Sequence, residues 1–283
     1  MDTVTVTIPV PALDHDAVLA VISDWPLLGV LQENDHVDAS LPAHEWTAAR
    51  RKTLVHWLSA NGYAPEFNVE LHPEKNWNRA WEETITPVRV GPFLLTPTWA
   101  EIPPEHADAT VIEIDPKMSF GTGHHATTRL LLRLLPEAVA PGDRVLDVGT
   151  GTGVLAIAAV RLGAHAALGV DVQETAIENA AENCARNDVA SIVTLRSGSI
   201  DVVPEAAFDV VLANITREVL RDLLPAFQQK VRPGGLLLLS GVFTGDRDAL
   251  LAAAADHGFA LHQDATEEGW WAGRLQATAA QKH

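Results

Sequence analysis

The 283-residue sequence contains a single cysteine, Cys184, so neither an internal disulfide nor a cysteine metal cluster is expected. No metal site of another kind is predicted. A lone thiol is typical of a reducing compartment, and we expect a cytoplasmic protein. No apolar run approaches the roughly 20 residues that a membrane-spanning helix needs. The first ten residues, MDTVTVTIPV, alternate polar and apolar side chains as a strand does, and they lack the blocks of a signal peptide.

Basic residues are also scarce, with 20 Lys and Arg against 37 Asp and Glu and a formal net charge of −17. Such a surface repels phosphate backbones, and the densest basic cluster, Arg50-Arg51-Lys52, is short. Direct binding of nucleic acid is therefore not expected. The acidity has two open interpretations: it steers a basic protein substrate, or it is a general solubility or salt adaptation.

Residues 1–72 have the pattern of a small separate unit, followed by a predicted linker helix over 73–85. Within the linker, Trp77 and Trp81 lie four residues apart and would pack one helical face against a domain. The order of strand-like and helix-like segments in the first unit is βαββαβ, which is typical of a ferredoxin-like layer of helices on a sheet. The expected segments are Thr3–Ile8, a helix over His15–Trp25 capped by Asp14, Leu27–Gln32, His36–Leu41, a helix over Ala43–Ala60, and Glu66–Leu71.

Residues 86–283 are predicted to form the second domain, in which strands and helices alternate from Arg144 onward. Helices begin near Val154, Glu174 and Arg217, and the last two strands form a hairpin. The predicted strands are RVLDV, AALGVDV, IVTLRS, FDVVLANI and GGLLLLSG, and the hairpin follows in FALHQDATEEGWWAGRLQAT. This alternation predicts an α/β fold with a doubly wound parallel sheet.

The stretch DVGTGTGVLA, from Asp147 to Ala156, fills the first strand-to-helix turn with Gly149, Gly151 and Gly153. Ligands of such sheets bind beyond the carboxyl ends of the strands, next to this turn. The spacing G-x-G-x-G differs from the dinucleotide fingerprint G-x-G-x-x-G, and no Lys-Ser/Thr pair follows as in a phosphate-binding loop. Glycine turns of this type also serve tight packing of a helix on a strand.

Asp171 ends the next strand in LGVDV, where an acidic side chain can accept hydrogen bonds from both ribose hydroxyls of an adenosine ligand. Its alternative role is to cap the following helix. Asp147, at the end of the first strand, is expected to organise the glycine loop through hydrogen bonds.

The glycine spacing, the acid Asp171 and the two extra strands together resemble the class I S-adenosylmethionine-dependent methyltransferases. The resemblance implies a seven-stranded sheet with an antiparallel last strand. The segments NWNRAW, DPKMSFGTGHHATTRLLL, LDVGTGTGVLAIAA, GVDVQETAIENAAENCARN, FDVVLANI and LSGV look like the PrmA family. That family methylates large-subunit ribosomal protein eleven on lysine side chains and on its N-terminal amine. The resemblance implies that residues 1–72 recognise this protein. We also expect a monomer.

By this resemblance the cofactor S-adenosylmethionine is held mainly at the glycine turn and at the ends of neighbouring strands. The implied contacts are Thr128, Gly149, Asp171 and Asn214, and Asn214 is also the predicted catalytic residue. Gly151, Gly153 and Ser199 are further predicted contacts. The chain departs from the family pattern at His124 and Ala126, where the family usually has Thr and Pro. Loss of the proline frees backbone entropy worth about 0.4–1 kcal/mol.

Asn214 is followed by Ile215 and Thr216, without the prolines and the aromatic residue with which other methyltransferases stack a planar substrate group. An aliphatic amine is therefore favoured, held by the Asn214 side-chain oxygen and neighbouring carbonyls. His124 or His125 is either a base for the amine or a residue that orders its loop.

Other functions stay open from the sequence. They are methylation of lysine in another protein, such as an electron-transfer flavoprotein subunit, a non-catalytic adenosine-binding module in ribosome assembly, and a nicotinamide-dependent reductase.

Overall fold

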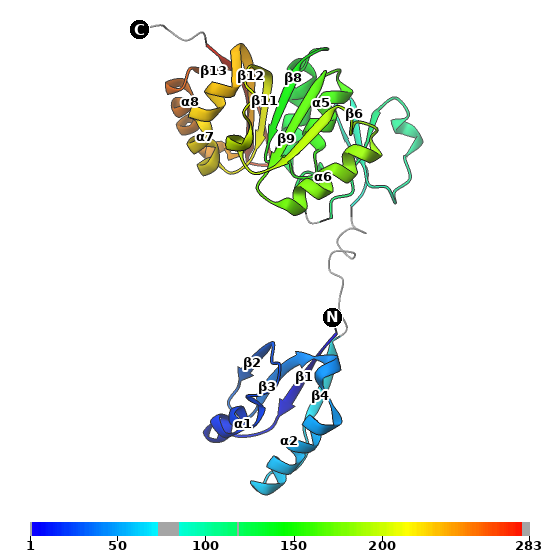
Figure 1. Ribbon diagram of the computed structural model, residues 1–283, viewed down its shortest axis with the longest axis vertical. Coiled ribbons are helices and arrows are strands. Elements are labelled where there is room, and N and C mark those ends of the chain that lie inside the picture. The colour runs from blue at the N-terminus through cyan, green and yellow to red at the C-terminus, as the bar shows by residue number, and fades with distance from the viewer. Residues whose placement is uncertain (1, 73–84, 118, 279–283) are drawn as a thin grey trace. The chain divides into compact units, whose positions relative to one another are not determined.

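The computed structural model describes residues 2–72, 85–117 and 119–278 (Figure 1). The chain divides into two compact units, Met1–Trp77 and Asn78–His283. The predicted linker helix over 73–85, with Trp77 and Trp81, lies outside the described residues except for Ile85. In the part of the chain that the structure describes, no helix is long and apolar enough to cross a membrane, and no group of three His, Cys, Asp or Glu residues is placed to hold a metal ion.

The first unit is a four-stranded antiparallel sheet in the order β2-β3-β1-β4 with two helices. Alternate residues of β1 face the helices, so Val4, Val6 and Ile8 pack into one core with Leu54 and Leu58. The elements are β1 (Thr3–Ile8), α1 (His15–Ile22), β2 (Gly29–Gln32), β3 (Val37–Pro42), α2 (Ala48–Ala60) and β4 (Asn68–His72). The ferredoxin-like assignment of this unit stays a prediction.

Both helices of this unit are shorter than predicted. Helix α1 ends at Ile22 and not at Trp25, because the residue before Pro26 is disfavoured in the helical region. Helix α2 begins at Ala48, after a 3₁₀ turn over Ala43–Glu45 and a cap in which the Thr47 side chain accepts a hydrogen bond from the Arg50 backbone. Asp14 precedes α1, but its carboxylate makes no cap and accepts the Tyr63 hydroxyl instead.

The second unit contains a seven-stranded sheet in the order β10-β9-β8-β11-β12-β14-β13. Neighbours from β10 to β12 are parallel, and β14 is antiparallel to both β12 and β13. The predicted α/β sheet with an antiparallel last strand is therefore confirmed. The strands are β8 (Arg144–Val148), β9 (Ala166–Asp171), β10 (Val193–Ser197), β11 (Phe208–Asn214), β12 (Val231–Phe243), β13 (Phe259–Glu267) and β14 (Trp270–Ala277).

Helices cover both faces of this sheet, because neighbouring residues of each strand point to opposite sides (Figure 1). Val145 packs on the side of α4 (Ala126–Leu134), α5 (Val154–Arg161) and α6 (Glu174–Arg186). Leu146 packs on the side of α7 (Arg217–Lys230) and α8 (Arg247–Asp256). Helix α8 is absent from the sequence prediction. A small sheet of β5 (Val88–Val90), β6 (Phe93–Thr96) and β7 (Thr110–Glu113) joins the core of α4 and α5.

Candidate cofactor and active site

A cavity of about 470 Å³ lies at the carboxyl edge of the parallel strands, within the size range of small-molecule sites. Predicted site residues that line it are Gly149, Gly151, Asp171, Ser199 and Asn214. Thr128 and Gly153 do not line it. Residues that the sequence prediction missed include Ser119, Phe120, Val172, Ile215, Thr216 and Leu223.

The three glycines of the loop have different tasks. All have positive φ, at 74° for Gly149, 54° for Gly151 and 82° for Gly153. A Cβ on Gly151 would lie 2.3 Å from the Phe120 carbonyl oxygen, and one on Gly149 would lie 2.4 Å from an Ile215 methyl group. Gly149 and Gly151 therefore leave the backbone at the cavity wall free of side chains. Gly153 instead lets α5 approach α6, because its Cβ would meet that of Ala180 at 3.2 Å.

Asp171 makes hydrogen bonds at the start of α6 and also lines the cavity. One carboxylate oxygen accepts the Gly151 backbone N–H at 3.0 Å, and the other accepts the Gln173 N–H at 3.0 Å. Each oxygen of an ionised carboxylate has a further acceptor site, so these bonds leave capacity for a ligand. The predicted capping role is wrong, because the N-cap of α6 is Gln173 and the helix has no side-chain cap bond. The role in ligand binding stays a prediction.

Asp147 is fully buried behind the loop and accepts the Thr150 hydroxyl at 2.7 Å. Its predicted role as an organiser of the loop is confirmed by this bond. Burial raises the pKa of the Asp147 carboxyl to about 7, and the nearby Asp171 charge adds to the shift.

The segment before α4 is tied to the glycine loop by backbone groups. The Thr152 N–H donates to the Phe120 carbonyl at 2.9 Å, and the Thr152 hydroxyl donates to the Gly121 carbonyl at 2.9 Å. Asn183 of α6 donates to the Thr152 carbonyl at 3.0 Å and accepts from the Asp115 N–H at 3.1 Å. This framework brings Ser119 and Phe120 to the cavity.

A sequence signal for this framework exists in α6. Asn179, Asn183 and Asn187 recur every four residues and are buried. Asn187 is the C-cap of the helix, but Asn179 and Asn183 lie in its interior, where asparagine is disfavoured. Asn187 accepts from the Glu113 N–H at 3.0 Å and donates to the Glu113 carbonyl at 2.7 Å. These three asparagines bind the backbone at the end of β7 and after it. Buried amides at helical spacing therefore indicate a neighbouring chain segment whose backbone groups need hydrogen-bond partners.

Asn214 ends β11 and presents its side chain at the cavity. Its Nδ2 donates to the hydroxyl of Thr128 at 3.3 Å, and Thr128 is fully buried in α4. The bond directs the amide nitrogen toward α4 and leaves the amide oxygen as the acceptor available to a ligand. Thr128 therefore acts on the cavity through Asn214.

The two histidines of this region order their own segment. His125 caps α4, since its Nδ1 accepts the Thr127 N–H at 3.3 Å. The His124 Nδ1 lies 3.2 Å from the Thr122 hydroxyl. Burial of the rings lowers the pKa of both histidines. Neither histidine lines the cavity, so the structure favours the loop-ordering role.

The sequence profile described as "Ribosomal protein L11 methyltransferase (PrmA)" matches residues 16–278 of this chain. The chain belongs to the PrmA family. A ribosomal protein L11 methyltransferase of Pelobacter propionicus is 34% identical over 308 aligned positions, covering 97% of each chain. One of Chlorobaculum parvum is 39% identical, covering 82% of each. A solved structure titled ribosomal protein L11 methylase, from Lactobacillus delbrueckii subsp. bulgaricus, aligns with a TM-score of 0.64 at 28% identity, over 69% of this chain and all of that one.

As a member of the PrmA family the chain is a methyltransferase that uses S-adenosylmethionine. The cavity fits this cofactor, because it offers the acceptor oxygens of Asp171, bare backbone at Gly149 and Gly151, and apolar side chains such as Val172 and Leu223. The cofactor carries no phosphate, which agrees with a loop that lacks the phosphate-binding spacing.

Replacing Gly151 with alanine is expected to lower the free energy of unfolding by roughly 2–4 kcal/mol, since strained φ and a displaced Phe120 carbonyl act together. Gly142 is a matched control: its φ is 93°, yet nothing lies within 4 Å of the place that a Cβ would take. Gly142→Ala is expected to cost only the φ strain, about 1 kcal/mol. Denaturant unfolding of both variants measures the difference. Equal losses would show that the Phe120 contact contributes nothing.

The raised pKa of Asp147 predicts that the stability of the fold depends on pH. Its folded pKa of about 7 lies above the ordinary value of 3.8, so the folded state retains a proton that the unfolded state releases between these values. The free energy of unfolding should fall as pH rises from 4 to 7, by up to about 1.4 kcal/mol per pH unit from this group. Asp147→Asn should flatten this part of the profile, whereas the exposed Asp201→Asn should not. Denaturation at pH 5 and pH 8 provides the measurement, and an unaltered slope in Asp147→Asn would contradict it.

Proposed function

We propose that this methyltransferase modifies ribosomal protein L11, at lysine side chains and at the N-terminal amine. The proposal that the substrate group is an amine rests on Asn214, whose amide oxygen is left free at the cavity by the bond to Thr128. The following Ile215 and Thr216 give no aromatic face on which a planar amide or base could stack. The names of the relatives support L11 as the protein substrate.

In this proposal the cofactor is held between the ends of β8, β9 and β11. The Asp171 carboxylate accepts hydrogen bonds from the ribose hydroxyls, and Gly149 and Gly151 allow close approach to the backbone. Ser199 supplies a polar contact after β10. Thr128 contributes by orienting Asn214, and Gly153 by placing α5 against α6.

When bound, S-adenosylmethionine supplies a methyl group on a positively charged sulfur. The amine must present a free lone pair, yet a lysine in water has a pKa of about 10.4 and is almost entirely protonated at pH 7. Desolvation at the cavity favours the neutral amine. The Asn214 oxygen accepts an N–H of this amine and so aims its lone pair, which shortens the search for the reactive orientation. An amide oxygen is no base, so the proton leaves to water.

The first unit is proposed to recognise L11. Removal of residues 1–72 should abolish methylation of L11 and leave the cofactor dissociation constant within about twofold, because the cavity is formed wholly by the second unit. Calorimetry with S-adenosylmethionine and a methylation assay on L11 measure the two effects. Full activity of the truncated protein would refute the recognition role.

Mass spectrometry of purified L11, before and after incubation with the enzyme and isotope-labelled cofactor, tests the proposed function. We expect labelled methyl groups on lysine and on the N-terminal amine, with one S-adenosylhomocysteine released per methyl group. An electron-transfer flavoprotein subunit serves as the competing substrate. Labelling of that subunit and not of L11, or label on L11 outside amines, would overturn the proposal.

A further inference from the structure

Four aromatic rings run in a continuous row at the carboxyl edge of the large sheet. The ring centroids of Phe120 and His125 lie 5.2 Å apart, and those of His125 and Trp270 lie 4.8 Å apart, both edge to face. Trp270 stacks on Phe243 at 4.0 Å with an interplanar angle of 24°. We call these four residues the aromatic ridge. The reaction steps derived above make no use of it.

One end of the aromatic ridge is part of the cofactor cavity. Phe120 lines this cavity together with Asn214. The next ring, His125, caps α4, the helix whose Thr128 binds the Asn214 amide. The ridge therefore starts in the same cavity as the amide that is proposed to hold the acceptor amine.

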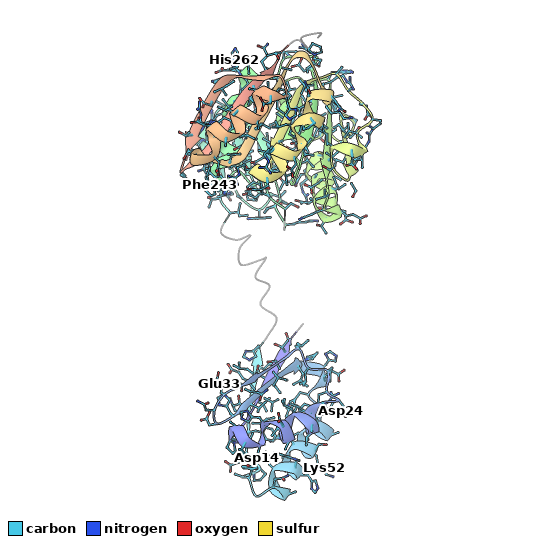
Figure 2. The ribbon with its side chains drawn as sticks, turned by 90° about the vertical axis from the view of Figure 1, so that its left-hand side faces the viewer. Asp14, Asp24, Glu33, Lys52, Phe243 and His262 are labelled. Atoms are coloured by element: carbon cyan, nitrogen blue, oxygen red, sulfur yellow. The ribbon has the colours of Figure 1, made fainter. Side chains whose placement is uncertain are left out.

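The other end leads away from the cavity along two neighbouring strands. Asn214 pairs with Ser240 of β12, and Phe243 follows three residues later on the same strand. Phe243 in turn pairs with Trp270, the first residue of β14. Figure 2 shows Phe243 at one end of this part of the sheet and His262 at the opposite end.

The rings at both ends of the ridge are open to solvent. Phe120 is 52% exposed and Phe243 is 55% exposed. Exposed apolar surface that continues into a ligand cavity is typical of a binding site. Among the described residues no lysine or arginine lies over a ring of the ridge, and the nearby Arg129 is held by Glu267 and Glu268. Phe243 and Trp270 each cover one face of the other, and no lysine or arginine of the described residues occupies the remaining ring faces.

We propose that the aromatic ridge binds the side chain of the acceptor lysine and guides it to Asn214. The four methylene groups lie against the rings, and the charged nitrogen is attracted by their π faces. This inference rests on the proposed function.

The test compares Phe243→Leu and Phe243→Tyr with the unaltered protein, using full-length L11 as substrate. Leucine keeps an apolar side chain but removes the ring, so kcat/KM for L11 should fall roughly three- to thirty-fold. Tyrosine should restore kcat/KM to within about twofold. The dissociation constant for S-adenosylmethionine should stay unchanged in both variants, because Phe243 does not line the cavity.

Trp99→Leu is the matched control, since Trp99 is 46% exposed and lies outside the ridge. Unchanged kcat/KM in Phe243→Leu would overturn the inference. So would a weakening of cofactor binding as large as the loss of activity, because the ridge would then only support the cavity. A change in oligomeric state that accounts for the loss would overturn it as well. If the unaltered enzyme places no methyl groups on amines of L11, the proposed function itself fails.

Discussion

Asn214→Ala should lower kcat by a hundredfold or more, with the dissociation constant for S-adenosylmethionine changed by less than about tenfold. A large effect on kcat is expected because, in the proposed function, the amide oxygen orients the amine that reacts, and orientation is worth several kcal/mol. The small effect on binding follows from the other cavity groups, above all Asp171, which remain in place. Single-turnover methylation of L11 and calorimetry with the cofactor separate the two quantities.

Thr128→Val provides the graded comparison for this prediction. The substitution keeps the volume of a fully buried side chain and removes the hydroxyl that accepts from Asn214. The amide stays present but loses its restraint, so kcat should fall by about tenfold, less than in Asn214→Ala. Equal losses of kcat and of cofactor affinity in Asn214→Ala would remove Asn214 from the chemical step.

Local patterns predicted the large sheet well. Strand β8 has the predicted bounds, Arg144–Val148, and the helices that begin at Val154, Glu174 and Arg217 begin where the apolar period changes from two to 3.6. Helix α8 was missed although its run LLAAAAD is rich in helix formers, because uniform alanine shows little amphipathic contrast.

The site was predicted less completely, because much of it depends on contacts between distant segments. Gly149, Gly151 and Asp171 follow strands, so their place at one edge of a parallel sheet can be derived from the sequence. The hydrogen bond from the Asn214 amide to the Thr128 hydroxyl joins residues 86 positions apart. Phe120 reaches the cavity only because Thr152 binds its carbonyl. Local periodicity contains no information on either contact.

Gly151 and Thr152, two consecutive residues of the glycine loop, connect Asp171 to the segment that carries Phe120. Asp171 accepts the Gly151 N–H, and the next residue, Thr152, donates to the carbonyls of Phe120 and Gly121. A displacement of Gly151 would therefore disturb the bonds to Asp171 and to the segment of Phe120. This connection makes it necessary to measure the stability of the fold alongside ligand binding whenever Asp171 is altered.

Asp171→Ala is expected to raise the dissociation constant for S-adenosylmethionine by about a hundredfold, because two hydrogen bonds to a charged acceptor are lost. Asp171→Asn keeps an acceptor oxygen without the charge, and it should weaken binding by about tenfold. At saturating cofactor, kcat should change little in either variant, in contrast to Asn214→Ala.

Calorimetric titration gives the affinities, and thermal unfolding without cofactor serves as the control. The alanine variant also loses the acceptors of the Gly151 and Gln173 N–H groups, so its melting temperature should fall. A titration at low temperature, counting only the folded fraction of the variant, removes the effect of lost stability from the measured affinity. If affinity in that fraction equals that of the unaltered protein, Asp171 only binds the Gly151 and Gln173 N–H groups, and the ribose must be held elsewhere. Asp171→Asn keeps one acceptor oxygen for these two N–H groups, so its melting temperature should fall less than that of Asp171→Ala. A loss of affinity in the folded fraction of Asp171→Asn would instead establish the contact with the ligand.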